Sequence, residues 1–167
     1  MTRLFVTTYK KYNDGNLFGA WLDLESYADK DAFLAACKEL HKDEADPELM
    51  FPDFEGFPRA LYNESGLDDR LWGWLELDED DREMVAVYLD EVSQDGDIDA
   101  ARDCFAGKFD SEEDWAADYL NDSGLMGSVP ASLLNYIDYK SFANDARLGG
   151  DMVFVHHQGS VLAFRNE

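Results

Sequence analysis

The residues that could do chemistry in this chain are mainly carboxylates, and they are densest between Glu76 and Glu83. This segment reads ELDEDDRE, with six carboxylates in eight residues, and the apolar run MVAVYL follows it directly. Carboxylates at this density could coordinate a cation, act as a general acid and base, or bind a basic partner. Their spacing must decide between these uses.

The spacing does not fit a metal or catalytic motif. In DGDID, placing Gly96 at the sixth position of an EF-hand loop puts Arg102 at the twelfth, where a glutamate is required. The adjacent His156 and His157 would point to opposite faces of a strand. We therefore predict no catalytic residue, no metal site and no cofactor.

One nuclease-like pattern keeps an alternative open. Asp138-Tyr139-Lys140 resembles the D-x-K half of a metal-dependent nuclease site, for which Asp53 could supply the other half. With 37 Asp and Glu residues such pairs arise easily by chance, and the chain has few cations with which to hold a polyphosphate. This alternative requires cleavage that depends on Asp138 and Lys140.

On a helix the acidic segment separates into two faces. At about 100° per residue, one side of the helix carries Glu76, Glu79, Asp80, Glu83, Asp90 and Glu91, and the other carries Met84, Val85, Tyr88, Leu89 and Val92, if the helix extends back to Glu76. Val87 is the exception, since it falls among the acids. Arg82 is the only base in this stretch, whereas a solvated helix face normally alternates its charges. The pattern favours a binding face for cations.

Composition agrees with a folded, highly acidic protein. The 167 residues are 46% hydrophobic and carry a formal charge of -23, with the largest excess of acids in the middle third. Such a chain is repelled by nucleic acid and by anionic membranes, and is attracted to basic clefts. Cys37 and Cys104 stand in no ligand spacing and are expected to be reduced. With no signal peptide and no long apolar run, we expect a soluble, cytoplasmic protein.

The elements that would position these residues begin with a sheet. Residues 3–9 and 17–24 read as strands around NDGN, a strong hairpin-turn signal. Residues 29–40 have helical apolar spacing after acidic first-turn residues. Residues 48–58 read as an interrupted edge strand, because Pro52 and Pro58 cannot donate to a ladder.

The rest of the chain is helical and then ends in strands. A helix is predicted from about Glu79 to Val92, and another after Ser111 with Gly124 as its stop. A third begins at Pro130 and contains PASLLNYIDYKSFANDA. The segments MVFVHH and SVLAFR are predicted to form a hairpin around Gln158-Gly159.

These elements predict an α+β protein made of three small modules strung into an elongated chain. The modules are an N-terminal α/β module with an antiparallel sheet, residues 1–60, a central acidic helical module, residues 61–107, and a C-terminal α/β module with a terminal hairpin, residues 108–167. In a row they would place about one carboxylate every 2 Å, against about one charge per 1.7 Å of duplex DNA.

The chain closely resembles the ArdA family of antirestriction proteins. The resemblance rests on YNDGNLFGAWL at residues 12–22, DFEGFP at residues 53–58 and GSVPASLLNYIDYKSFANDA at residues 127–146. It implies an elongated, dimeric, non-catalytic mimic of B-form DNA that occupies the DNA-binding groove of type I restriction-modification enzymes. It also implies carriage by mobile elements, which transfer horizontally, and action in the bacterial cytoplasm.

Two sets of residues follow as candidate contacts. The expected phosphate-mimicking acids are Glu76, Asp78, Glu79, Asp80, Glu83, Asp90, Glu91, Asp95, Asp97, Asp99, Glu112, Glu113, Asp114 and Asp118. The resemblance implies that the antirestriction motif and dimer contact include Val129, Pro130, Ser132, Leu133, Leu134, Tyr136, Ile137, Asp138, Tyr139 and Phe142. A general acidic binding protein or chaperone for basic proteins stays open as the alternative.

Overall fold

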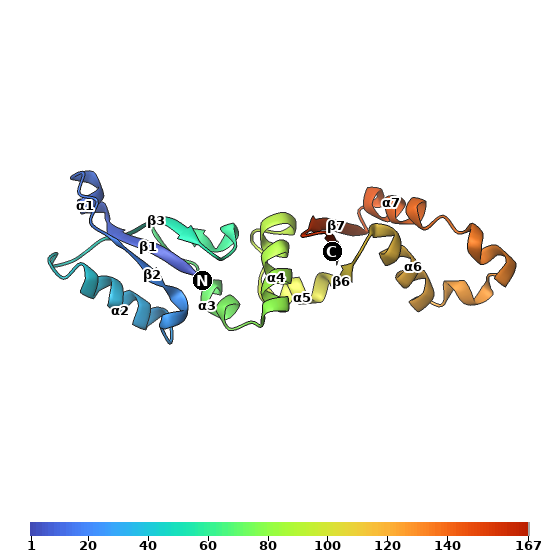
Figure 1. Ribbon diagram of the computed structural model, residues 1–167, viewed down its shortest axis with the longest axis horizontal. Helices are drawn as coiled ribbons and strands as arrows, with labels where there is room; N and C mark the ends of the chain where they lie inside the picture. The colour runs from blue at the N-terminus through green and yellow to red at the C-terminus, as the bar shows by residue number, and fades with distance from the viewer. Residues whose placement is uncertain (167) are drawn as a thin grey trace. The chain divides into compact units, whose positions relative to one another are not determined.

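The computed structural model describes residues 1–166 and divides the chain into two compact units (Figure 1). The first unit is Met1–Ala86, and the second begins at Val87, inside a helical segment. The mixed α+β class with small antiparallel sheets and a C-terminal hairpin is confirmed. The division into three modules and their elongated arrangement stay predictions.

The first unit is built on a three-stranded antiparallel sheet with strand order β2-β1-β3. Its strands are β1 (Arg3–Thr8), β2 (Ala20–Asp23) and β3 (Leu49–Glu55). The expected pairing of the first two strands is present, but NDGN does not close a tight hairpin. A short helix, α1 (Tyr9–Asn13), precedes that turn because the Thr8 side chain accepts a hydrogen bond from the Lys11 amide and caps it.

The predicted edge strand is present, with its proline accommodated by an irregularity. Met50 pairs with Thr7 and Asp53 with Phe5, so two residues of β3, one of them Pro52, oppose one residue of β1. A bulge of this kind tolerates a residue that lacks an amide proton. Short elements follow: η2 (Arg59–Leu61), β4 (Tyr62–Asn63) and β5 (Gly66–Leu67).

Helix α2 (Lys30–Leu40) packs against this sheet, after the 3-10 turn η1 (Leu24–Ser26) (Figure 1). The Asp29 carboxylate accepts a hydrogen bond from the Ala32 amide and begins the helix as the sequence predicts. Phe33 is fully buried, with its ring centroid 6.3 Å from that of Phe51 on β3. Burial raises the pKa of the Cys37 thiol to about 12, so this cysteine is an inert core residue.

The acidic segment forms helices, and the predicted start at Glu79 is confirmed, whereas the predicted end at Val92 is not. Helix α3 (Arg70–Leu75) ends before Glu76, and α4 (Glu79–Val87) begins at Glu79, so the helix does not extend back to Glu76. Residues Tyr88–Val92 then form a π-helical turn, η3, in which the Ser93 amide donates to the Tyr88 carbonyl. The 100° construction therefore applies only within α4, because a π turn is wider.

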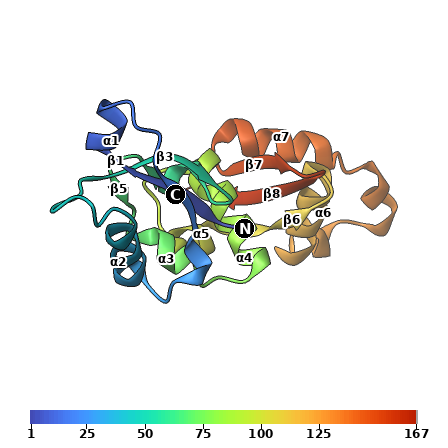
Figure 2. The same cartoon turned by 60° about the vertical axis from the view of Figure 1, so that its left-hand side comes forward.

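The second unit has a sheet of strand order β6-β8-β7 covered by two helices. Its elements are α5 (Ile98–Cys104), β6 (Phe105–Phe109), α6 (Glu112–Asp122), η4 (Leu125–Ser128), η5 (Ala131–Tyr136), α7 (Tyr139–Gly149), β7 (Met152–His157) and β8 (Ser160–Arg165). Figure 2 shows α7 lying along the sheet beside β7. Trp115, Ala116, Ala143, Met152 and Ala163 form its buried core.

In this unit one prediction is confirmed and another is wrong. The terminal hairpin turns at Gln158 and Gly159 as predicted, and both have positive φ, of 48° and 86°. The run from Pro130 is not one helix. It forms η5 and then restarts as α7 after Asp138, whose carboxylate caps the new helix. Among residues 1–166, no helix is long and apolar enough to cross a membrane.

A polar cluster surrounds the buried Lys11 side chain of α1 in the first unit. The Lys11 ammonium donates to Glu44 at 2.6 Å and to Asp43 at 3.0 Å, and the Thr8 hydroxyl donates to Glu44 at 2.7 Å. His41, fully buried beside this cluster, has no hydrogen-bond partner for either ring nitrogen among the described residues. Burial, and then the nearby Lys11 charge, lowers the pKa of His41.

His41 should make the stability of the chain depend on pH. Because its pKa is lower in the folded state, the unfolded chain binds a proton first. His41 therefore does not reduce the free energy of unfolding above about pH 6.5. As the pH drops below that value, the free energy of unfolding decreases by at most about 1.4 kcal/mol per pH unit. We expect urea unfolding between pH 7.5 and pH 5 to show this loss.

Two variants separate titration from packing. His41→Leu and His41→Gln should both flatten the profile, since neither side chain titrates. Leucine should also be the more stable at pH 7.5, because it leaves no polar atom unpaired. A wild-type slope that persists in His41→Leu would assign the pH dependence to other groups.

Candidate partner-binding surface

The predicted phosphate-mimicking acids are largely exposed in the structure. Of the fourteen, twelve are exposed and two, Glu83 and Glu112, are half-buried. They belong to both units: the residues from Glu76 to Glu83 lie in the first and those from Asp90 onward in the second. Whether they form one continuous face stays a prediction.

The first two carboxylates of α4 are exposed to solvent, whereas its base, Arg82, is half-buried. Glu79 and Asp80 are exposed, and within residues 1–166 no ion pair holds either. Met84, Val85 and Val87 on the same helix are buried. The apolar face is thus as predicted, and Val87, which the wheel placed among the acids, packs inward as well.

Arg82 explains how this segment keeps its negative charge. Its guanidinium donates to Glu25 Oε1 at 2.7 Å and to the Leu75 carbonyl, and it lies 5.4 Å from the ring centroid of Trp74. The Trp74 indole donates to the Arg82 carbonyl. The single base of the acidic segment therefore ties α4 to the rest of the first unit.

Several of the predicted acids also begin helices. Asp78 accepts from the Asp81 amide at 2.9 Å and Asp97 from the Ala100 amide at 2.8 Å. Asp114 accepts from the Ser111 hydroxyl, while its own amide donates back to that serine. Such residues serve the fold and still present negative charge, because a carboxylate is stabilised at the positive end of a helix.

The Glu112 carboxylate is held by contacts within the second unit. Its carboxylate contacts the Arg147 guanidinium at 3.1 Å and His156 Nε2 at 3.1 Å, and its side chain is 18% exposed. These contacts join α6 to α7 and β7. We therefore regard Glu112 as mainly structural, which its position in the acidic SEED segment did not indicate.

The block predicted to form the dimer contact divides into an exposed and a packed part. Leu133, Leu134 and Tyr136 on η5 are exposed by 52%, 37% and 82%. In contrast, Tyr139 and Phe142 at the start of α7 pack against the core of the second unit. Of the remaining positions, Val129, Pro130, Ser132 and Ile137 lie in or beside η5, and Asp138 directly precedes α7. An unusually apolar exposed surface thus precedes α7.

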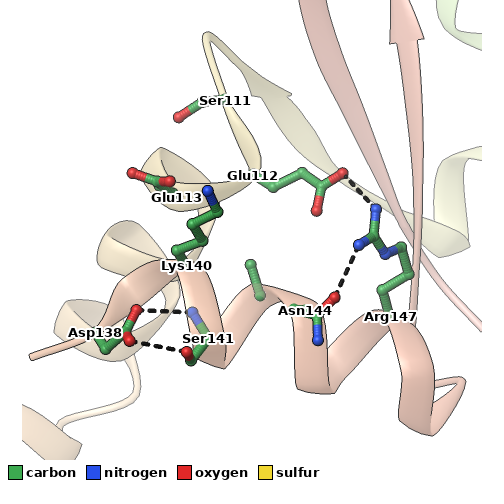
Figure 3. Close-up of a pocket in the computed structure, with 9 residues that line it drawn as sticks. Ser111, Glu112, Glu113, Asp138, Lys140, Ser141, Asn144 and Arg147 are labelled. Carbon is green, nitrogen blue, oxygen red and sulfur yellow. Dashed lines mark hydrogen bonds and ion pairs between the residues drawn. The ribbon is translucent and has the colours of Figure 1, made fainter.

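A polar pocket of about 460 Å³ lies between the beginnings of α6 and α7 (Figure 3). Asp138 and Ser141 lie at one end, and Arg147, bonded to Glu112 and Asn144, at the other. Lys140 also lines it. The pocket contains the D-x-K residues, so its chemistry bears directly on the nuclease alternative.

The geometry of Asp138 suits a cap better than a metal ligand. One of its oxygens accepts from the Ser141 amide at 2.9 Å and the other from the Ser141 hydroxyl at 2.8 Å. Asp53, the proposed second half, belongs to the other unit. Among residues 1–166, no three His, Cys, Asp or Glu side chains gather where they could hold a metal ion. Nothing in this arrangement favours phosphodiester cleavage.

Capping by Asp138 gives a testable difference between two substitutions. We expect Asp138→Ala to lower the melting temperature, because the Ser141 amide loses its acceptor, whereas Asp138→Asn should retain most of it. The hydrogen bonds from Ser141 lower the pKa of Asp138, so its contribution is present above about pH 4 and is lost as the pH falls. Thermal unfolding at pH 7 and pH 3 measures both effects.

Equal melting temperatures for the alanine and asparagine variants would contradict a capping role. Magnesium-dependent cleavage of DNA that is lost in Asp138→Asn and in Lys140→Met would instead restore the nuclease alternative.

Comparison with known proteins identifies the family. Residues 4–160 match the family model described as antirestriction protein, ArdA. All three sequence blocks on which the resemblance rests lie inside this range. No curated protein matches the chain at a significant level. A match over nearly the whole chain shows that it belongs to the ArdA family of antirestriction proteins.

Proposed function

We propose that this protein is a DNA mimic that competitively occupies the DNA-binding groove of type I restriction-modification enzymes. Its exposed carboxylates would take the positions of phosphates against the Lys and Arg side chains that otherwise hold DNA. The observation that carries the proposal is the start of α4, where Glu79 and Asp80 are exposed while Arg82 is turned inward. Family membership supplies the antirestriction role.

The proposed mechanism involves no chemical reaction. DNA and the inhibitor compete for the same basic cleft, and long-range attraction speeds their encounter while it weakens as salt rises. Each exposed ion pair contributes about 0 to 1 kcal/mol, so affinity comes from many contacts. In this proposal the protein is a non-catalytic inhibitor that needs no cofactor. It acts in the bacterial cytoplasm, and mobile elements carry it to protect incoming DNA.

Neutralising exposed acids of α4 and of the η3 turn that follows it should weaken inhibition more than the same charge change elsewhere. Glu79→Gln, Asp80→Asn and Glu91→Gln combined should raise the concentration that displaces DNA by about tenfold and reduce its dependence on salt. The measurement is displacement of labelled DNA from a type I methyltransferase core at several salt concentrations.

The matched control neutralises three exposed acids of the first unit, Asp31→Asn, Asp46→Asn and Glu64→Gln. Equal losses in both triple variants would show that net charge, not this surface, governs binding. Comparable binding to histone-like or ribosomal proteins would favour the general acidic chaperone instead.

We also propose a homodimer formed through the block from Val129 to Phe142. The support is the exposure of Leu133 and Tyr136, which would otherwise place large apolar side chains in water. Leu133→Ser with Tyr136→Ser should convert a dimeric mass in light scattering to the mass of one chain. Leu125→Ser, 57% exposed just outside the block, is the control and should stay dimeric. A wild-type monomer at micromolar concentration would refute this proposal.

A further inference from the structure

The first turn of α4 presents exposed acids but has no apolar side chain to hold it. This turn covers residues 79–82, and the buried apolar side chains of the helix begin only at Met84. The connection from α3, which we call the corner, is three residues long, 76–78. Each of these residues keeps two soft backbone torsions, so the corner does not by itself fix the direction of the turn. Contacts across the corner are needed to do so.

Arg82 makes contacts across the corner in both directions. Its guanidinium donates to the Leu75 carbonyl at the end of α3, where carbonyls lack a partner within their own helix. In return, the buried Trp74 indole of α3 donates to the Arg82 carbonyl at 3.2 Å. The side chain and the backbone of Arg82 are therefore both held by α3, which fixes the last residue of the first turn.

A third contact joins the same side chain to the sheet of the first unit. Glu25 on η1, which follows β2 directly, accepts a hydrogen bond from Arg82 Nη1 at 2.7 Å. The planar guanidinium presents its donors in a rigid fork, so Nη1 binds Glu25 while Nη2 binds the Leu75 carbonyl. One base thus connects the first turn of α4 to two other elements of its unit.

We propose that Arg82 is a positioning residue for inhibition: it fixes the first turn of α4 so that Glu79 and Asp80 are presented to the basic cleft of the inhibited enzyme. This inference rests on the proposed function and deepens it. Acids on a fixed turn lose less conformational entropy when they bind than acids on a loose one. A base therefore increases the affinity for a basic partner, although its own charge opposes binding.

The positioning role predicts a change of opposite sign to the one that charge alone predicts. Arg82→Met keeps the aliphatic stem but removes the positive charge, so the chain becomes more negative and charge alone would strengthen its attraction to a basic cleft. If Arg82 positions the acids, the variant should inhibit less well. About threefold more protein should be needed to displace labelled DNA from a type I methyltransferase core, because exposed ion pairs contribute modestly.

A cycle of variants separates positioning from a general effect on the fold. In a background that carries Glu79→Gln and Asp80→Asn, Arg82→Met should cause no further loss, because the acids it positions are already neutral. The matched control is Lys38→Met, which removes one exposed base from α2 of the same unit and should need no more protein than wild type. Arg82→Lys retains the charge and should recover part of the loss.

A second variant tests the corner without changing charge. Trp74→Phe removes the indole donor to the Arg82 carbonyl, so it should weaken displacement in the same direction as Arg82→Met. It takes the place of Arg82→Met in the cycle if that variant does not fold. Circular dichroism and the melting temperature show which variants are folded at the temperature of the assay.

The outcomes separate this inference from the proposed function. Wild-type protein that displaces DNA, with a folded Arg82→Met variant equally or more effective, overturns the positioning role and leaves the DNA mimic standing. Equal losses from Arg82→Met with and without Glu79 and Asp80 also overturn it, and assign Arg82 to the fold alone. Wild-type protein that never displaces DNA overturns both proposals.

Discussion

Electrostatic self-repulsion is the constraint on which the rest of this structure depends. A formal charge of -23 on 167 residues opposes any compact state, so the fold must place carboxylates where they cost least. One solution recurs along the chain: carboxylates cap the first turns of helices and accept hydrogen bonds from otherwise unpaired amides. The residues that do so are Asp23, Asp29, Asp78, Asp97 and Asp138.

The few bases complement this arrangement by holding elements together. Lys11 on α1 is buried and pairs with Glu44 and with the exposed Asp43, and Arg82 joins α4 to α3 and to Glu25. Arg147 connects α7 to α6 through Glu112. Bases used in this way stabilise the fold without neutralising Glu79 or Asp80. A protein that binds by negative charge needs this separation, because a base beside each acid would cancel the field that attracts its partner.

Apolar contacts add specificity that charge alone does not give. Exposed carboxylates attract any basic surface, so they speed association over a long range but discriminate little between basic partners. The structure exposes large apolar residues in several places, among them η5 with Leu133 and Tyr136. In our proposal these residues of η5 associate two copies.

The sequence by itself determined the local elements with strong signals. Asp29 and Ser111 mark helix beginnings, Gln158-Gly159 marks the hairpin, and the apolar period predicts the buried face of α4, because these signals act within a few residues. Family membership also followed from short blocks of sequence.

Tertiary structure alone decided the features that depend on distant partners. Strand β6 exists because it pairs with β8, some fifty residues later in the chain, and a five-residue FAGKF segment has no such signal of its own. The Arg82 side chain points inward because it contacts Glu25 and Trp74. Glu112 is held in place because it contacts Arg147 and His156. Sequence could therefore name the acids, while only packing determined which of them remain available to a partner.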